Sequence, residues 1–230
     1  MLPAARQIMS HAAPPSALLL LARGCPHCPA VLAGLSELLK RGVIGRLEAV
    51  NIEVEPELAA RWGVRGVPWL RLGPFRLTGS LSLGELETWA ARAGDPEQGL
   101  ADAFHDLLKT GAAGQVLELV REAPSRLAAL LPIVANPEAS LNVRLGAGMV
   151  FEELAGHGAL VALSPRLEAL ARDADARVRA DAAHLLGLGR DDSARTCLKS
   201  LLDDADPDVR EIAGESLAML DPAAGAAGGD

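Results

Sequence analysis

The sequence lacks tyrosine and holds only three tryptophans and three phenylalanines among its 230 residues. Alanine (42) and leucine (40) together supply over a third of the chain. An all-β sandwich needs more β-branched and aromatic residues, so this composition excludes one and favours helices packed through small and aliphatic side chains. Half of the residues are hydrophobic, which also excludes a wholly disordered chain.

Long apolar runs are missing as well, because none reaches the length of about 18 residues that a membrane span needs. The run at 17–22 follows Arg6, but it is shorter than the apolar part of a secretory signal, which takes about 7–15 residues. We therefore expect no membrane partner and a cytoplasmic protein, with the periplasm as the alternative location.

Basic residues are scarce in the second part of the chain. Residues 1–96 carry ten Lys and Arg against eight Asp and Glu, a net charge of +2, whereas residues 97–230 carry twelve against twenty-two, a net charge of −10. Binding to nucleic acid needs Lys and Arg opposite the phosphates, so we expect no nucleic-acid partner.

Only three cysteines occur, Cys25, Cys28 and Cys197, which is too few for a secreted scaffold held by disulfides. A close CxxC pair in a chain of this size indicates either redox chemistry or half of a zinc site. Zinc needs two more ligands, and the sequence offers only Cys197 and scattered histidines. We therefore predict no metal and no other cofactor, and we expect Cys197 to be a buried core thiol.

Residues 16–95 alternate between strand and helix signals. Apolar residues recur at helical spacing over 26–40, which predicts a helix with Pro26 in its first turn, where the missing N–H costs nothing. Ser82 and Glu85 form a capping box that predicts the start of another helix. The predicted order is strand 17–22, helix 26–40, strand 47–54, helix 56–62, strands 69–72 and 75–78 as a hairpin, and helix 82–92.

From residue 97 the strand signals vanish and an internal repeat follows. Val143-Arg144, Val178-Arg179 and Val209-Arg210 lie 35 and then 31 residues apart, each after acidic or amide residues and before small ones. These segments resemble HEAT-like repeats, which stack pairs of helices into a solenoid. The resemblance implies that the acidic residues cap the second helix of each pair and that each arginine bridges to acids of the neighbouring repeat.

These patterns divide the chain into four parts. We predict a flexible leader at 1–15, an α/β domain at 16–95, an all-α domain of HEAT-like repeats at 97–221, and a disordered Ala/Gly-rich tail at 222–230.

The CxxC pair lies between a predicted strand and a predicted helix. Cys25 lies at the helix N-terminus, where unpaired N–H groups and the helix dipole favour a thiolate, and Cys28 lies one turn further on. This arrangement suits thiol–disulfide exchange, in which Cys25 attacks a disulfide and Cys28 resolves the mixed disulfide. His27, when protonated, further stabilises the Cys25 anion and makes the disulfide more oxidising.

The CPHC motif, with Pro26 and His27 between its cysteines, and the later segment Gly66-Val67-Pro68-Trp69 resemble the thioredoxin family. The run after Cys25 is similar to glutaredoxin-like protein disulfide oxidoreductases and to the N-terminal domain of the alkyl hydroperoxide reductase flavoprotein. The resemblance covers residues 16–94 and implies a thioredoxin fold. It also implies a cis-proline loop that faces the cysteines and binds the substrate chain through Val67, Pro68 and Trp69, although core packing is an equal alternative for Trp69.

Two positions depart from the thioredoxin pattern. Gly24 precedes the first cysteine where thioredoxins have tryptophan, and Leu19 occupies the place of a buried acid that assists proton transfer to the resolving cysteine. The resemblance therefore does not extend to fast general reductase turnover, and no acid after Gly79 marks a glutathione site.

Three functions fit these features. The first is a thiol–disulfide oxidoreductase that acts on protein disulfides or dithiols and is recycled by an external reductase or oxidant, with the HEAT-like domain binding substrate or partner. The second is a redox-gated adaptor or co-chaperone whose thioredoxin-like domain mainly docks a partner. The third, an electron shuttle for peroxide reduction, rests on local resemblance and needs an external flavoprotein.

Overall fold

The computed structural model describes residues 13–95 and 98–221, and the chain divides into the units Met1–Leu100 and Ala101–Asp230. Most of the predicted leader at 1–15 and all of the predicted tail at 222–230 lie outside the described residues. Within the described residues no helix combines the length and the apolar character needed to cross a membrane.

The first unit is built on a four-stranded mixed sheet in the order β2-β1-β3-β4. β1 runs parallel to β2 and antiparallel to β3, and β3 pairs with β4 as the predicted hairpin. Leu20 of β1 lies opposite Val50 of β2 on one side and Trp69 of β3 on the other. The strands are β1 (Ser16–Leu21), β2 (Arg46–Asn51), β3 (Trp69–Leu72) and β4 (Phe75–Thr78).

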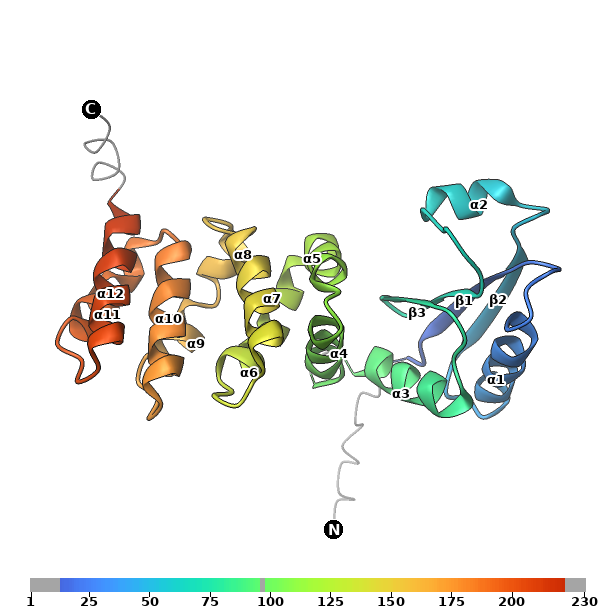
Figure 1. Cartoon of the computed structure of the whole chain (residues 1–230), viewed down its shortest axis with the longest axis horizontal. Helices are drawn as coiled ribbons and strands as arrows, with labels where there is room; N and C mark the ends of the chain where they lie inside the picture. The colour runs from blue at the N-terminus through green and yellow to red at the C-terminus, as the bar shows by residue number, and fades with distance from the viewer. Residues whose placement is uncertain (1–12, 96–97, 222–230) are drawn as a thin grey trace, which may run out of the picture. The chain divides into compact units, whose positions relative to one another are not determined.

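Three helices, α1 (Cys28–Lys40), α2 (Pro56–Arg61) and α3 (Leu83–Gly94), cover the sheet. Figure 1 shows α1 and α3 on one face and α2 on the other. The predicted capping box is confirmed: the Ser82 hydroxyl accepts from the Glu85 N–H, and the Glu85 carboxylate accepts from the Ser82 N–H. The Ser82 N–H and the Ser82 hydroxyl both donate to the Glu85 carboxylate, and these two hydrogen bonds lower the pKa of the Glu85 carboxyl.

The predicted start of the first helix is wrong by two residues. α1 begins at Cys28, with His27 as its N-cap residue, so Pro26 lies in the preceding loop and Pro29 occupies the first turn. Either proline satisfies the same rule, because neither position has an N–H that the helix needs. The sequence rule therefore could not choose between them.

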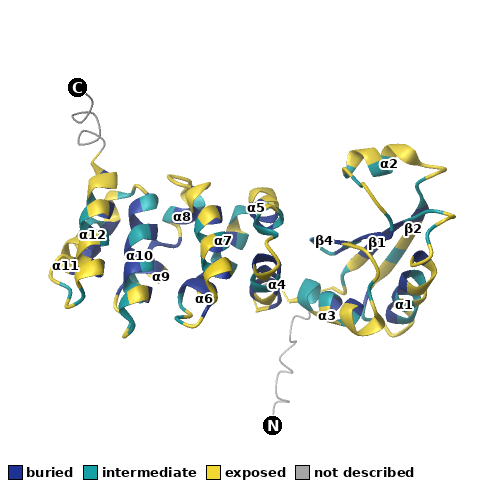
Figure 2. Cartoon of the chain, viewed as in Figure 1, coloured by how far each residue is buried: buried dark blue, intermediate teal, exposed yellow. Residues whose placement is uncertain are grey.

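The second unit contains helices only, within the part of the chain that the structure describes. Three long helices, α7, α10 and α12, contain the three Val-Arg pairs near their starts, and Figure 2 shows α10 buried along much of its length. The elements are α4 (Gln98–Lys109), α5 (Ala113–Glu122), η1 (Pro124–Leu130), α6 (Leu131–Val134), α7 (Leu141–Glu152), α8 (Gly158–Val161), α9 (Ser164–Leu170), α10 (Ala176–Leu188), η2 (Asp192–Ala194), α11 (Arg195–Leu201) and α12 (Pro207–Leu220).

Acidic residues cap the last two long helices, as the resemblance implied, but not the first, because α7 begins after Ser140, whose side chain makes no capping hydrogen bond. Asp175 accepts a hydrogen bond from the Arg177 N–H at the start of α10, 2.9 Å away. Asp206 accepts from the Asp208 and Val209 N–H groups at the start of α12. Each cap satisfies backbone donors that lack a partner within the helix.

Two of the three expected arginine bridges between repeats are present, whereas Arg210 donates to the carbonyls of Asp204 and Ala205 in its own repeat. Arg179 binds Asp204 with two hydrogen bonds of 2.7 and 2.8 Å and donates to the carbonyls of Asp173 and Ala174. Arg144 of the preceding repeat binds Asp181 at 2.7 Å. The hydrogen bonds from Arg179 lower the pKa of the Asp204 carboxyl. The side chains of Arg179 and Asp204 are largely buried, so water screens this pair less than the exposed pairs.

We expect Gly187→Ala to destabilise the helical unit, although alanine normally favours a helix. A Cβ at Gly187 would lie 2.7 Å from Ser216 Cβ and 2.8 Å from Ser216 Cα, where α10 and α12 meet, and such overpacking costs about 1–3 kcal/mol. Urea unfolding followed by far-ultraviolet circular dichroism measures the loss. All three tryptophans (Trp62, Trp69 and Trp89) lie in the first unit, so their fluorescence transition should not move.

Gly214→Ala is the matched control, because its Cβ would meet only Leu202 Cδ2 at an ordinary 3.9 Å. This variant should gain about 0.5–1 kcal/mol from helix propensity. Equal stabilisation by both substitutions would contradict the close approach of α10 and α12.

Asp204→Asn should lower the free energy of unfolding at pH 7 by about 1.5–3 kcal/mol, because charged hydrogen bonds to Arg179 are lost. The lowered pKa of Asp204 means that its contribution is present at neutral pH and disappears as the pH falls below about 4. The difference between wild type and variant should therefore shrink between pH 7 and pH 3. Glu153→Gln, which breaks the exposed Arg121–Glu153 pair, should change stability by less than about 1 kcal/mol. If wild type and Asp204→Asn differ in the free energy of unfolding by the same amount at pH 7 and pH 3, the assigned role of the Asp204 carboxylate is wrong.

Candidate active site

Cys25 and Cys28 lie in the connection between β1 and α1 and are joined by a disulfide, with their Cα atoms 5.5 Å apart. The Cys25 N–H donates to the Ala22 carbonyl at 3.3 Å, which turns the chain immediately after the strand. Cys28 is the first residue of α1, so the helix begins at the disulfide itself.

The two sulfur-bearing residues differ in exposure. Cys25 is partly exposed, whereas Cys28 has a relative exposure of only 4%. An incoming thiol or disulfide therefore reaches Cys25 first. Cys28 can react with Cys25 without leaving the protein interior.

The start of α1 provides a donor for the Cys25 sulfur. The Cys28 N–H points at Cys25 Sγ with a distance of 3.1 Å. This amide belongs to the first turn of the helix, where N–H groups have no helical acceptor and the dipole favours negative charge. When the disulfide is reduced, the same geometry stabilises a thiolate on Cys25.

Pro26 and His27 are both exposed between the cysteines. His27 serves as the N-cap residue of α1 through its backbone, and its side chain makes no capping hydrogen bond. The His27 side chain is therefore exposed to solvent, and His27 directly precedes Cys28 in the sequence.

The segment with Val67, Pro68 and Trp69 lies at the same edge of the sheet as the cysteine loop. Because β3 is antiparallel to β1 and Trp69 pairs with Leu20, the residues before Trp69 lie beside the end of β1. The Val67–Pro68 peptide bond is cis, as predicted. The Pro68 carbonyl accepts from the Gly79 N–H at 3.0 Å, which ties this loop to the end of β4.

The three residues of this segment differ in what they can offer a substrate. Val67 is half-buried and Pro68 is buried. The Trp69 side chain is 5% exposed and packs with Leu18 and Leu20 in the core under α2. Of the two roles that the sequence left open for Trp69, the structure supports core packing.

Trp62 is a neighbour of the site that sequence analysis did not select. Its ring lies 5.9 Å from the Trp69 ring, and the guanidinium groups of Arg71 and Arg76 lie 4.9 and 5.3 Å from its centre. Arg71 and Arg76 are direct partners across the β3–β4 hairpin, so they share a face of the sheet. In the sequence, Arg71 alternates with the apolar residues Leu70 and Leu72, which indicates that Arg71 lies on the opposite face of β3 from them. This alternation was the signal that could have revealed the cluster of arginines around Trp62.

Cys197, the third cysteine, is free and is not part of the disulfide. It lies in α11, is buried, and burial raises the pKa of its thiol. The expected core thiol is confirmed. No group of three or more His, Cys, Asp or Glu side chains in the described ranges is arranged to hold a metal ion.

Comparison with known proteins identifies part of the second unit. A family model of HEAT repeats matches residues 163–227. Comparison with curated proteins gave no match, and no thioredoxin-family model matches the first unit. The chain therefore combines an α/β domain that carries a Cys25–Cys28 disulfide with a C-terminal helical region that contains HEAT repeats.

After reduction, iodoacetamide should modify native Cys25 first, because this residue is partly exposed and the α1 amide favours the reactive thiolate. Cys28 should react much more slowly, and Cys197 should react only on unfolding, because it is buried with a raised pKa. Peptide mapping by mass spectrometry measures the three rates. Modification in urea provides the control, since there all three thiols should react alike. Faster modification of Cys28 than of Cys25 in the native protein would reverse the assigned roles.

Proposed function

We propose that this protein is a thiol–disulfide oxidoreductase that acts on protein substrates through Cys25 and Cys28, with the HEAT-like domain binding the substrate or a partner. One observation carries the proposal. The disulfide lies at the first residue of α1 and joins a partly exposed cysteine to a buried one.

The arrangement of the first unit supports a thioredoxin-like domain. Its sheet order is β2-β1-β3-β4, with β1 and β2 parallel and a following antiparallel hairpin. The parallel pair is connected through α1, and the cysteines lie in the connection that leaves the end of β1. The Val67–Pro68 loop lies at that same end.

The proposed exchange proceeds in two steps. The Cys25 thiolate attacks one sulfur of a substrate disulfide, forms a Cys25–substrate disulfide, and releases the other substrate sulfur as a thiolate that takes up a proton. Cys28 then loses its proton, attacks Cys25 Sγ, and displaces the second substrate sulfur, which is protonated in turn. Two electrons and two protons pass to the substrate, and the Cys25–Cys28 disulfide is left for an external dithiol reductase to reduce. An oxidase runs the same steps in reverse, with an external oxidant.

Each remaining site residue has a defined part in this proposal. The Cys28 N–H and His27 stabilise the Cys25 thiolate, and Pro26 restricts the backbone of the exposed loop between the cysteines. The backbone of Val67 and Pro68 positions the substrate chain beside Cys25, since main-chain pairing with an extended segment is a common mode of peptide recognition. Trp69 supports this loop from the core.

The HEAT repeats favour a second candidate, a redox-gated adaptor or co-chaperone. Helical repeats present extended surfaces for partner proteins. In this alternative the α/β domain docks a partner and its disulfide adjusts that contact without turnover.

Trapping with Cys28→Ser separates the two candidates. An exchange enzyme should accumulate mixed disulfides through Cys25, because the resolving sulfur is absent. These adducts should disappear on reduction and should not form with Cys25→Ser or with the double variant. Reduced and carboxymethylated substrate protein, which has no disulfide, is the control for noncovalent binding. If the double variant retains the same partners as the wild type and Cys28→Ser traps nothing, the adaptor proposal replaces the enzyme.

The direction of exchange follows from the reduction potential of the Cys25–Cys28 couple in glutathione buffers. A value near about −270 mV indicates a reductase, and one near about −120 to −180 mV an oxidant or isomerase. The second range would also favour the periplasm over the cytoplasm. Absence of any reversible couple would refute the enzyme proposal.

A further inference from the structure

One face of α7 exposes an apolar stripe. Leu141, Leu145 and Met149 follow one another at four-residue spacing and are 67%, 63% and 39% exposed, respectively. Residues four apart lie on the same face of a helix, so these side chains form one continuous strip. The core of the unit is formed instead by the opposite face, where Val143 and Val150 are buried.

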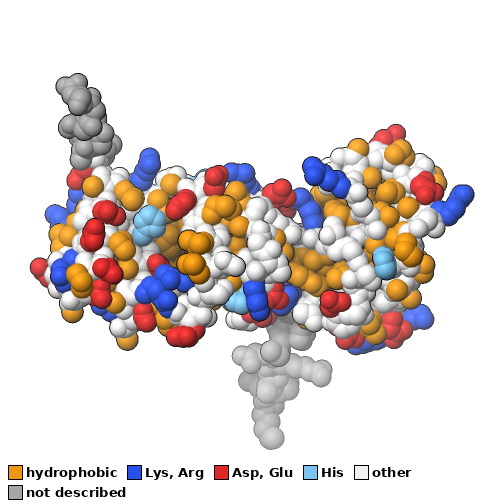
Figure 3. All heavy atoms as spheres, viewed as in Figure 1, with side chains coloured by type: hydrophobic (Ala, Val, Ile, Leu, Met, Phe, Trp, Pro, Cys, Tyr) orange, Lys and Arg blue, Asp and Glu red, His pale blue; other side chains and the backbone are white. Residues whose placement is uncertain are grey.

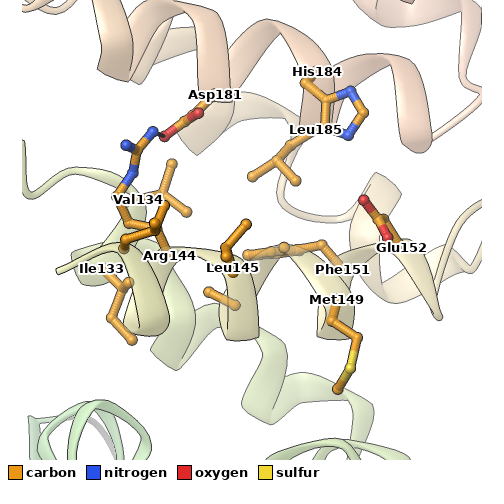
Figure 4. A pocket seen from close by; sticks show the side chains of 13 residues that line it. Ile133, Val134, Arg144, Leu145, Met149, Phe151, Glu152, Asp181, His184 and Leu185 are labelled. Atoms are coloured by element: carbon orange, nitrogen blue, oxygen red, sulfur yellow. Dashed lines mark hydrogen bonds and ion pairs between the residues drawn. The ribbon is translucent and has the colours of Figure 1, made fainter. Parts of the chain in front are cut away.

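A groove of about 340 Å³ adjoins this stripe, between α6 and α7 on one side and α10 on the other. All of its lining residues belong to the helical unit. Figure 4 shows Arg144 and Asp181 at one end, Glu152 at the other, and Leu145 and Leu185 between them. The other apolar residues that line the groove are Ile133, Val134, Ala147, Phe151 and, from the stripe, Leu141 and Met149.

The charged side chains that line the groove, Arg144, Asp181 and Glu152, sum to a net charge of −1. Arg144, which lines the groove, is paired with Asp181 at 2.7 Å, whereas Glu152 is exposed at the other end. Glu211 and Glu215 are exposed on α12, which packs against α10. Figure 3 shows hydrophobic side chains gathered over α7 and acidic side chains over α12.

The repeat alignment places these features on one surface. Counted from the valine of each repeat, Met149, His184 and Glu215 occupy the same position, six residues later. The corresponding face therefore changes from apolar on α7 through histidine on α10 to acidic on α12. A ligand that covers this face must bring both apolar and cationic groups.

We propose that this groove binds an amphipathic helix of a partner protein, with large aliphatic side chains on one face and Lys or Arg on the other. A third helix fits between two packed helices by setting its side chains into the groove between them. Its aliphatic side chains cover Leu141, Leu145 and Met149, and its cations approach Glu152 and the acidic face of α12. Such a helix is the class of partner that we assign to the HEAT-like domain. Only the idea that this partner is also a redox substrate rests on the proposed function.

The test uses the full chain and a fluorescein-labelled peptide of about 18 residues, or roughly five helical turns, made of leucine at helical spacing and lysine elsewhere. Fluorescence anisotropy should show saturable binding that weakens with added salt, because the lysines face carboxylates. A peptide with the same leucines and glutamate in place of lysine should bind at least tenfold more weakly. Equal binding of the two peptides would overturn the charge argument and with it the proposed partner.

Leu145→Ser tests the apolar contact. Losing the burial of one leucine should weaken binding by about tenfold or more. Leu202→Ser is the matched control, because Leu202 is also an exposed leucine, at 42%, and does not line the groove. Glu152→Gln should weaken binding of the lysine peptide and flatten its salt dependence. Unchanged affinity in Leu145→Ser, or absence of binding to the wild type, would refute the site.

Two further measurements distinguish the possible failures. Sedimentation velocity detects self-association, and a dimer that Leu145→Ser dissociates would replace the partner helix with a second copy of the chain. The reduction potential of Cys25–Cys28 should be the same in wild type and Leu145→Ser. Peptide binding at Leu145 without a redox couple would refute the proposed enzyme and keep the groove, whereas a normal couple without binding would refute the groove alone.

Discussion

The pairing of β1 with both of its neighbours determines where the chemistry of the first unit lies. β1 is the strand to which β2 and β3 both bond, and its residues Ala17–Leu20 are buried. Parallel pairing with β2 requires a crossover, which α1 supplies, so the chain must leave the end of β1 through the cysteine loop. Antiparallel pairing with β3 brings the Val67–Pro68 loop back to that end. A slip of one residue between β1 and β3 would move the side chains of Trp69 and Arg71 to the opposite face and disrupt both layers of the core.

In the second unit, the adjacent residues Val178 and Arg179 determine how one repeat packs on the next. Val178 is buried between helices, and the next residue, Arg179, therefore emerges at the border of the same contact. From there its guanidinium reaches Asp204 of the following repeat and the carbonyls before α10. The valine supplies apolar packing, and the arginine fixes the register of one repeat on the next with directed hydrogen bonds. This division explains why the pair recurs as a unit in the sequence.

Local rules predicted most elements of the fold. The hairpin 69–72 and 75–78 and the capping box at Ser82 depend on residues close in sequence, and both are confirmed. The acidic caps and the arginine bridges depend on the repeat, and each is confirmed at two of the three repeats. The CxxC pair was evident for the same reason, and the structure joins it in a disulfide.

Features that depend on distant packing were harder to predict. Trp69 and Arg71 point to the same face of the sheet, yet Trp69 is buried and Arg71 is not. Leu58, Trp62 and Val64 pack against the cluster that contains Trp69, whereas Arg71 contacts the Trp62 ring through its guanidinium. The exposed stripe on α7 was missed because Leu141, Leu145 and Met149 have the helical spacing that usually marks a core. Sequence periodicity indicates that an apolar face exists, but not whether another element covers it.

The core around the cysteines also constrains how the proposed exchange handles protons. Leu19, at the position where thioredoxins carry a buried acid, is fully buried and pairs with Leu70. Among the described residues, the buried polar side chains are Ser164 and Ser216, so no buried carboxylate accepts the proton of Cys28. That proton must leave on the exposed side of the loop, to water or to His27. In the proposed exchange, a substrate bound over this side would restrict the route of the proton and so couple substrate contact to resolution by Cys28. If the HEAT-like domain holds the substrate through a separate surface, as we propose, the mixed disulfide stays in place while the Cys28 proton leaves.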